Sequence, residues 1–315
     1  MIAHIHYQYI LGCEPQWTAK LVVTLAANSH IIDCDTETQK WMEQCVNDHA
    51  GTTDKELVKN ASLYEITSLK RKYLTTIEVD GAFTKDKYLN LFGNPSLVLV
   101  ENGPYEWPVY QMMIDAYKND RNYRNIFAVL LNAVNGPHRT LQELHAGGNG
   151  SFISLINSKE DSPEYKGLTK LKIYAVTDSD KASETAPYLP TPKSLYRFFC
   201  GCRNKEEVDR TNIDTLNQPL YHWHMWRKRT IENYFPPEKY EIIGLNADQY
   251  RSYHIPERYF KKVEKEINGY DKNNLKHVAQ SMSRRDYEAI CDKLTINGNT
   301  VSEIQLFLLK MAKVV

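Results

Sequence analysis

Apolar and polar positions follow different patterns along the chain and divide it into three regions. In the first region, residues 1–90, Ile2–Ile10 alternates apolar and polar side chains, which predicts a strand. Lys20–Leu25 is rich in residues that favour strands, whereas Thr36–Asn47 and Asp54–Leu74 have the spacing of amphipathic helices. The first region is therefore expected to be an α/β region.

Short apolar segments alternate with helical segments in the second region, residues 91–245. Tyr105–Lys118 is predicted as a helix, with Pro108 in its first turn, where a missing N–H has little effect. The predicted buried strands are Ser96–Glu101, Ile126–Leu131, Leu171–Val176 and Leu220–Trp226. Strands that alternate with helices at this spacing predict a mostly parallel sheet with helices on both faces.

The third region, residues 246–315, is rich in charged residues and is expected to be helical. Its last apolar segment, Ile304–Met311, has the pattern of a C-terminal helix. Asn-Gly pairs at 268–269 and 297–298 predict turns within this region. The expected fold class is α/β, with helices dominating the C-terminal region.

Composition narrows the classes of function. The chain of 315 residues has 39 Lys and Arg against 39 Asp and Glu, so its net charge of zero argues against nucleic-acid binding over the whole surface. No apolar run approaches the roughly 18–20 residues of a membrane span, and the N-terminus lacks the pattern of a secretory signal. Six cysteines without a zinc-ribbon pattern are expected to be reduced thiols. We expect a cytoplasmic protein with no membrane partner.

Acidic residues follow two of the predicted strands at the point where each strand ends. Glu101 follows the apolar strand 97–100, and Asp178 and Asp180 follow the strand 173–177. Ligands of open parallel sheets bind at the carboxyl ends of the strands, and Asp-x-Asp directs both carboxylates to one side of an extended segment. Glu106 and Glu232 are further acids close to predicted strand ends. Such oxygen ligands suit Mg²⁺ or Mn²⁺.

Each acid also has an ordinary structural interpretation. Asp-x-Asp after a strand is most often a turn or a helix cap, because Asp favours both positions. The residues alone leave a metal site and this interpretation open. The segment Arg227-Lys228-Arg229 is similarly ambiguous, since it could contact phosphate or form a solvated run of charge. His222-Trp223-His224 is expected to show the alternation of a strand rather than to bind metal.

Three short motifs, in this order and spacing, resemble the signatures of a TOPRIM domain. They are the segments 97–103 (LVLVENG), 178–180 (DSD) and 229–234 (RTIENY), and a glycine-rich turn at 147–151 lies between the first two. The resemblance covers about residues 85–245 and is greatest to TOPRIM nucleases of the OLD type and their bacterial anti-phage relatives. It implies a TOPRIM-like, mostly parallel sheet for residues 91–245.

The resemblance also implies a function. It implies a metal-dependent endonuclease that hydrolyses phosphodiester bonds of DNA or RNA, as an effector in bacterial anti-phage defence. Mg²⁺ or Mn²⁺ would be held by Glu101, Asp178 and Asp180, with Glu232 and Glu106 supporting a second ion, and the catalytic residues would be Glu101, Asp178, Asp180 and Glu232. The alternative is a non-catalytic TOPRIM-like scaffold or adaptor subunit of a defence complex.

One feature of the sequence departs from the family pattern. Asn102 is inserted, so Glu106 follows Glu101 by five residues rather than the family's four, which puts the role of Glu106 in question. The family also uses a lysine near the site, for which Lys228, Lys239, Lys261 and Lys262 are candidates. The relatives are governed by an ATPase, yet this chain contains no phosphate loop of the G-x-x-x-x-G-K-[ST] type. A separate ATPase or sensor subunit is therefore a hypothetical partner, beside the nucleic-acid substrate.

Overall fold

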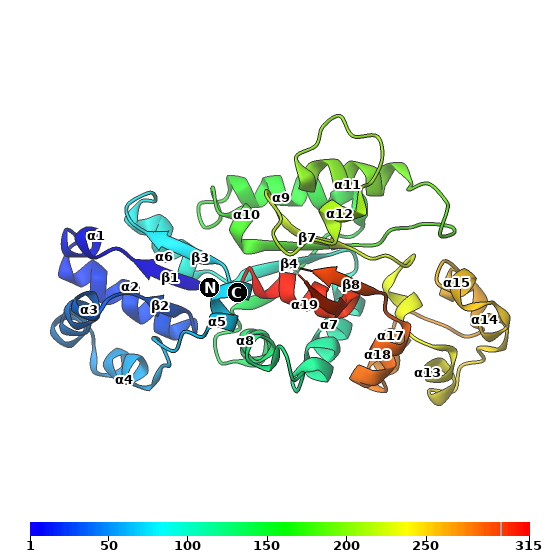
Figure 1. Ribbon diagram of the computed structural model, residues 1–315, viewed down its shortest axis with the longest axis horizontal. Helices are drawn as coiled ribbons and strands as arrows, with labels where there is room; N and C mark the ends of the chain where they lie inside the picture. The colour runs from blue at the N-terminus through cyan, green and yellow to red at the C-terminus, as the bar shows by residue number, and fades with distance from the viewer. Residues whose placement is uncertain (297) are drawn as a thin grey trace.

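The computed structural model describes residues 1–296 and 298–315, and the chain forms a mixed α/β protein with parallel sheets flanked by helices (Figure 1). The N-terminal part holds a three-stranded parallel sheet in the order β2-β1-β3. Its strands are β1 (Ile2–Ile5), β2 (Ile31–Asp33) and β3 (Thr76–Val79). Its helices are α1 (Tyr7–Leu11), α2 (Pro15–Ala27), α3 (Thr36–His49), α4 (Thr52–Asn60), α5 (Ser68–Tyr73) and α6 (Lys85–Gly93).

Several details of the first region differ from the prediction, although the helix predicted at 36–47 is confirmed as α3. The strand predicted for Ile2–Ile10 ends at Ile5, and the chain then turns into α1. The prediction of a strand at Lys20–Leu25 is wrong, because Leu21, Val22 and Leu25 have helical spacing and lie on the buried face of α2. The helix predicted for Asp54–Leu74 is interrupted between α4 and α5.

The central part is built on a four-stranded sheet in the order β5-β4-β6-β7, and all its neighbouring strands are parallel. The strands are β4 (Ser96–Val100), β5 (Leu141–His145), β6 (Ile173–Thr177) and β7 (His222–Met225). The helices are α7 (Gly103–Tyr117), α8 (Arg124–Asn135), α9 (Phe152–Asp161), α10 (Thr169–Lys172), α11 (Pro190–Cys200) and α12 (Arg210–Ile213), with short 3-10 helices η1 (Asn149–Ser151) and η2 (Ile231–Tyr234).

Side chains of β4 show how both faces of this sheet are covered. Leu97 and Leu99 pack with α9 and α11, whereas Val98 and Val100 pack with α7, α8 and the C-terminal helix α19 (Glu303–Ala312). In Figure 1 the first group of helices lies above the sheet and the second below it. Because both faces are covered, β4 and β6 are buried along their whole length and mostly apolar, and the prediction of covered parallel strands is confirmed for them.

Two predictions for the central region are wrong. Ile126–Leu131 was predicted as a strand but lies in α8, whose apolar residues recur at helical spacing. The strand that the prediction missed is β5, which lies at the sheet edge and exposes most of its side chains. Pro108 lies inside α7 and not in its first turn, because the helix begins at Gly103.

Residues 246–315 are not purely helical, which corrects the description of a helical C-terminal region. They contain an antiparallel hairpin, β8 (Lys293–Ile296) and β9 (Asn299–Ser302). The helices from η2 onward are α13 (Pro237–Ile242), α14 (Asp248–Ser252), α15 (Ile255–Arg258), α16 (Val263–Glu266), α17 (Asn274–Gln280), α18 (Arg284–Ile290) and α19. The turn at 268–269 is confirmed, with Gly269 at φ 78°, whereas that at 297–298 lies partly outside the described residues.

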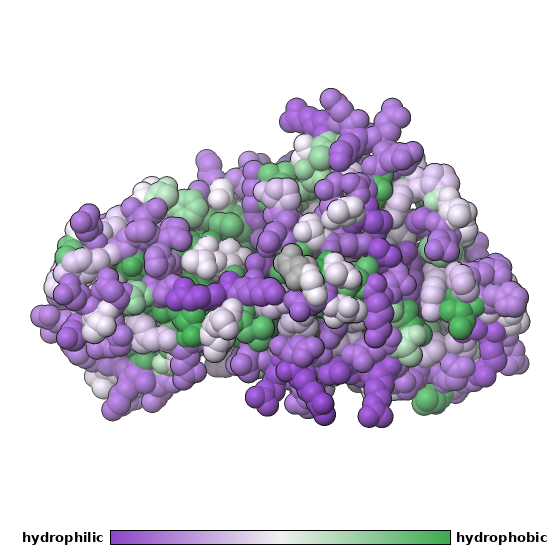
Figure 2. All heavy atoms as spheres, in the orientation of Figure 1, coloured by the Kyte–Doolittle hydropathy of each residue, from purple (hydrophilic) through white to green (hydrophobic). Residues whose placement is uncertain are grey.

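The C-terminal residues share the core of the central part instead of forming a core of their own. Phe307 and Leu308 of α19 are fully buried with Val98 and Val176, and the Tyr174 hydroxyl donates to the Phe307 carbonyl at 2.9 Å. Figure 2 shows hydrophilic side chains over most of one face of the molecule, with only small apolar areas between them. No helix among the described residues is long and apolar enough to cross a bilayer.

Glu303, the first residue of α19, is fully buried in a polar cluster that joins α19 to β7 and η2. Its carboxylate accepts the Arg227 amide at 2.8 Å and the Tyr234 hydroxyl, and it lies 3.3 Å from Nε2 of His224. Burial raises the pKa of Glu303, but the neighbouring His224 and the surrounding basic side chains outweigh burial and lower the pKa to about 2. The carboxylate is thus charged in the folded protein and satisfies several donors.

We expect Glu303→Ala to lower the free energy of unfolding by about 3–5 kcal/mol, because it leaves buried donors without their acceptor. Urea denaturation followed by circular dichroism measures this. The matched control is Glu206→Ala on an exposed loop, which should change the value by less than about 0.5 kcal/mol. Equal effects of the two substitutions would contradict the structural role of Glu303.

Candidate functional site

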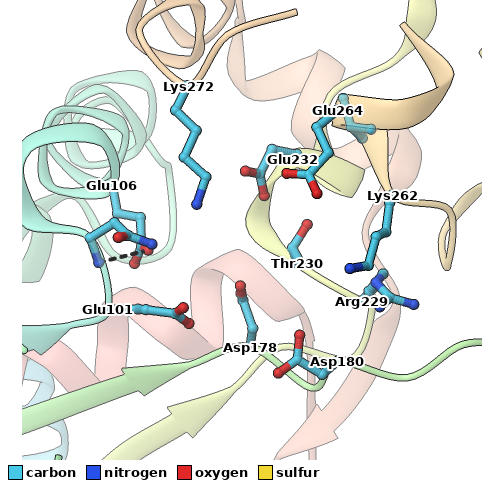
Figure 3. A pocket seen from close by; sticks show the side chains of 12 residues that line it. Glu101, Glu106, Asp178, Asp180, Arg229, Thr230, Glu232, Lys262, Glu264 and Lys272 are labelled. Carbon is cyan, nitrogen blue, oxygen red and sulfur yellow. Dashed lines mark hydrogen bonds between the residues drawn. The ribbon is translucent and has the colours of Figure 1, made fainter. Parts of the chain in front are cut away.

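A cavity of about 140 Å³ opens at the carboxyl edge of the central sheet, where β4 and β6 end (Figure 3). It contains every acid that the sequence motifs single out. The residues that line it are Glu101, Asn102, Glu106, Asp178, Asp180, Arg229, Thr230, Glu232, Lys262, Val263, Glu264 and Lys272. Six of these side chains are carboxylates and three are cations, so the cavity is strongly polar and net acidic.

Glu101 and Asp178 meet because their strands are parallel neighbours. Leu99 of β4 pairs with Ala175 of β6, so the strands end at nearly the same level and Asp178 follows directly beside Glu101. Figure 3 shows both carboxylates directed into the cavity from the strand ends. The structure thus places these two acids, which the sequence analysis singled out at strand ends, in one cavity.

The loop after β6 is held in place by the loop after β7. The Ser179 hydroxyl donates to the Lys228 carbonyl at 2.7 Å, and the amides of Ser179 and Asp180 both donate to the Arg229 carbonyl at 3.1 Å. Asp180 has φ 53°, in the left-handed region that few residues other than glycine adopt. These hydrogen bonds fix the Asp-x-Asp turn, so that Asp180 lines the same cavity as Asp178.

Glu232 enters from η2, the short helix formed by the IENY motif. Thr230 and Asn233 form a capping box at its start, and the Tyr240 hydroxyl donates to the Glu232 carbonyl at 2.9 Å. The Asn233 amide group donates to the carbonyls of Arg258 and Lys261 at 3.1 and 2.9 Å. Asn233 therefore anchors the segment that carries Lys262 to the helix that carries Glu232.

Glu106 lines the cavity despite the inserted Asn102. Asn102 is the non-helical N-cap of α7, with φ −127° and ψ 74°, and Glu106 lies in the first turn of this helix. The Glu106 carboxylate accepts the Asn102 amide at 3.0 Å and the Tyr110 hydroxyl at 3.2 Å, and only 7% of the residue is exposed. The extra residue is thus accommodated before the helix, and it does not remove Glu106 from the site.

Of the four lysines considered from the sequence, only Lys262 lines the cavity. Lys239 pairs with Asp286, and Lys261 pairs with Glu257. Lys272 also lines the cavity, and sequence reasoning missed it because it lies between short elements with no motif of its own. Figure 3 shows Lys272 directed toward the space between Glu106 and Glu232, with Lys262 beside Arg229.

The basic run Arg227-Lys228-Arg229 does not act as one surface. Arg227 pairs with Asp214 and Asp292 at 2.8 and 3.2 Å. Lys228 is only 2% exposed, and its ammonium lies 3.9 Å from the centre of the Tyr259 ring. Arg229 alone lines the cavity, so a contact with phosphate there is available to Arg229 and not to its two neighbours.

Burial and the crowding of the carboxylates raise the pKa values of Asp178, Glu106 and Glu101. Burial, followed by the charges of Glu106, Glu232, Glu101 and Asp180, raises the pKa of Asp178 well above its usual range. Burial and the charges of Glu232 and Glu101 raise the pKa of Glu106 to about 7. Burial and Asp180 raise the pKa of Glu101, which Lys272 partly opposes. A cluster of this kind favours the binding of a cation.

The oxygen-rich set of ligands fits a hard divalent ion better than it fits a soft one. The carboxylates are nonetheless spread around the cavity. Among the described residues, the only group of three potential ligands whose atoms lie within 4.8 Å of one another is His4, His6 and Glu78, in the N-terminal part. The wider spacing suits ions that retain water molecules and bind phosphate oxygens, for which the cavity has room.

Comparison of the chain with protein-family models, with curated proteins and with solved structures gives no match. The class of protein that the structure defines is therefore an α/β protein with an acidic cavity at the carboxyl edge of a parallel sheet.

The raised pKa of Glu106 predicts a pH-dependent stability in the absence of metal. An unfolded glutamate titrates near about pH 4.3, so between this value and about 7 the folded protein holds a proton that the unfolded chain has lost. The contribution of Glu106 to the free energy of unfolding must therefore decrease as the pH rises from about 4.3 to about 7. The measurement is the difference in unfolding free energy between wild type and Glu106→Gln, in EDTA, at several pH values. A difference that is constant or rises with pH would contradict the assignment.

Proposed function

We propose that the protein is a metal-dependent endonuclease of the TOPRIM type that hydrolyses phosphodiester bonds of DNA or RNA. The observation that carries the proposal is the convergence of Glu101, Asp178, Asp180 and Glu232 on one cavity, from the motifs at which the sequence resembles that family. Parallel strand ends place these acids together, and three cations face them across the same space.

Charge and position assign a separate role to each group of residues in the cavity. Glu101, Asp178 and Asp180 would hold Mg²⁺ or Mn²⁺ at the strand ends, with Glu232 and Glu106 supporting a second ion. When bound, such ions supply an activated water and offset the negative charge of the phosphodiester. Without metal, burial and the neighbouring acids raise the pKa of Glu106 to about 7, so an ion that binds Glu106 near neutral pH would displace a proton.

The cations of the cavity would bind the substrate backbone. Arg229 presents a guanidinium, which suits phosphate oxygens, and its N–H group also donates to the Lys181 carbonyl at 3.1 Å. Lys262 is exposed beside it and can reach a phosphate that enters from solvent. Acids alone would repel a polyanion, so both the cations and the metal are needed for a substrate to approach.

The biological setting follows from the resemblance. We propose a cytoplasmic effector in bacterial anti-phage defence, governed by a separate ATPase or sensor subunit. The wide spacing of the carboxylates favours a second candidate, a non-catalytic TOPRIM-like scaffold or adaptor. The two candidates differ in whether the acids of the cavity are needed for cleavage or only for structure.

The proposal is tested with the purified chain, labelled DNA and RNA, and Mg²⁺ or Mn²⁺. We expect cleavage that EDTA abolishes, and we expect Glu101→Gln and Asp178→Asn each to reduce the rate on the order of 100-fold or more, because each removes a ligand charge. Asp161→Asn, on the exposed end of α9, is the matched control and should retain the wild-type rate.

Isothermal titration with Mn²⁺ separates the two candidates. A nuclease must bind the ion in wild type and bind it more weakly in Asp178→Asn. Metal binding without cleavage of either polymer would support the scaffold, whereas cleavage that survives both substitutions would overturn the assignment of the site.

A further inference from the structure

A second cluster of ligands lies at the carboxyl edge of the small N-terminal sheet, remote in sequence from the acidic cavity. β1 is the central strand of this sheet, and His4 pairs in register with Asp33 of β2 and Glu78 of β3. The three side chains therefore form a row across the sheet. His6, two residues farther along, directs its ring to the same face.

The imidazoles of His4 and His6 converge on a single carboxylate oxygen. Nε2 of His6 lies 2.7 Å from Oε2 of Glu78, and Nε2 of His4 lies 3.9 Å from the same atom. Two donors bound to one tetrahedral Zn²⁺ lie roughly 3.3 Å apart, because each bond is about 2.0–2.1 Å long. The observed separations bracket this value, so small side-chain shifts would bring all three donors to one ion.

A supporting layer orients His4 for this purpose. Nδ1 of His4 lies 3.2 Å from Oδ2 of Asp33, and Arg71 of α5 holds the Asp33 carboxylate with both nitrogens of its guanidinium fork. A carboxylate on Nδ1 fixes the tautomer in which Nε2 is free to bind a metal, which is the usual arrangement behind metal-binding histidines.

The cluster is open to solvent on one side. The side chains of His4, His6 and Glu78 are 40%, 46% and 52% exposed, whereas Asp33 behind them is 14% exposed. Ile2, earlier on the same face of β1, is buried against Tyr73 and Leu74 at the end of α5. This face of β1 is thus packed in the core at Ile2, and it is open to an ion from solvent at His4.

We propose that His4, His6 and Glu78 form a site for a transition-metal ion of the Zn²⁺ type, supported by Asp33 and Arg71. Two imidazoles and one carboxylate prefer such an ion to Mg²⁺, and three protein ligands leave a position open for water or an exogenous ligand. The bound ion would join β1 to β3. The site is independent of the proposed nuclease centre, which needs harder oxygen ligands.

The test is Zn²⁺ binding by the untagged full chain, measured by competition with a chromophoric chelator and by the visible absorption of bound Co²⁺. We expect one site that millimolar Mg²⁺ does not displace and that persists in Asp178→Asn. His4→Asn and Glu78→Gln should each weaken Zn²⁺ binding by more than about 100-fold, and Asp33→Asn by about 10–100-fold.

His49→Asn is the matched control, because His49 is an exposed histidine of the same part of the chain and should leave the affinity unchanged. Circular dichroism confirms that each variant is folded. The proposal is overturned if Zn²⁺ binding is absent, if it is unaffected by His4→Asn and Glu78→Gln, or if the urea-unfolded chain binds Zn²⁺ equally well. Since the readout is metal affinity, this outcome is distinct from a failure of the nuclease assay.

Discussion

Parallel pairing of β4 with β6 is the constraint on which the acidic cavity depends. Two buried parallel neighbours that are paired in this register end at the same edge of the sheet, so the residues that follow them are brought to the same edge. Here those residues are Glu101 and Asp178, and the hydrogen bonds from Ser179 and Asp180 to the Arg229 carbonyl add the loop after β7 to the same place. The fold thus gathers like charges that would separate in a flexible chain.

Gathering these charges opposes folding, and the surrounding structure must offset the effect. The raised pKa values of Asp178 and Glu106 show that their ionised forms are disfavoured in the folded protein. The apolar helix α19, buried beneath the sheet with its charged first residue Glu303 fully paired, supplies packing on the opposite side of the strands. The hydrogen bonds of Glu303 to Arg227 and Tyr234 also hold the segment that carries Arg229 and Glu232, so the buried helix supports the polar cavity.

The elements that could be predicted from the sequence are those whose pattern of apolar and polar residues matches their burial in the fold. β4 and β6 are buried and mostly apolar because they are covered on both faces, and their acids follow directly. β5 could not be found because it is an edge strand with few buried residues, and Ile126–Leu131 was mistaken for a strand because a short apolar segment does not distinguish a strand from a buried helix. Lys272 joins the cavity only through tertiary folding, so no local signal marks it.

Each of the two parallel sheets carries a proposed site at its own carboxyl edge, but the two sites differ in their ligands. In the central sheet the carboxyl edge bears carboxylates and, across the cavity, Arg229, Lys262 and Lys272, a combination suited to a hard ion and a polyanionic substrate. In the N-terminal sheet the corresponding edge bears the imidazoles of His4 and His6 and the carboxylate of Glu78, with Asp33 and Arg71 behind His4. Donor type therefore separates the two proposed sites: the edge that bears the imidazoles would bind Zn²⁺ in preference to Mg²⁺, because imidazole nitrogen binds Mg²⁺ poorly and Zn²⁺ well.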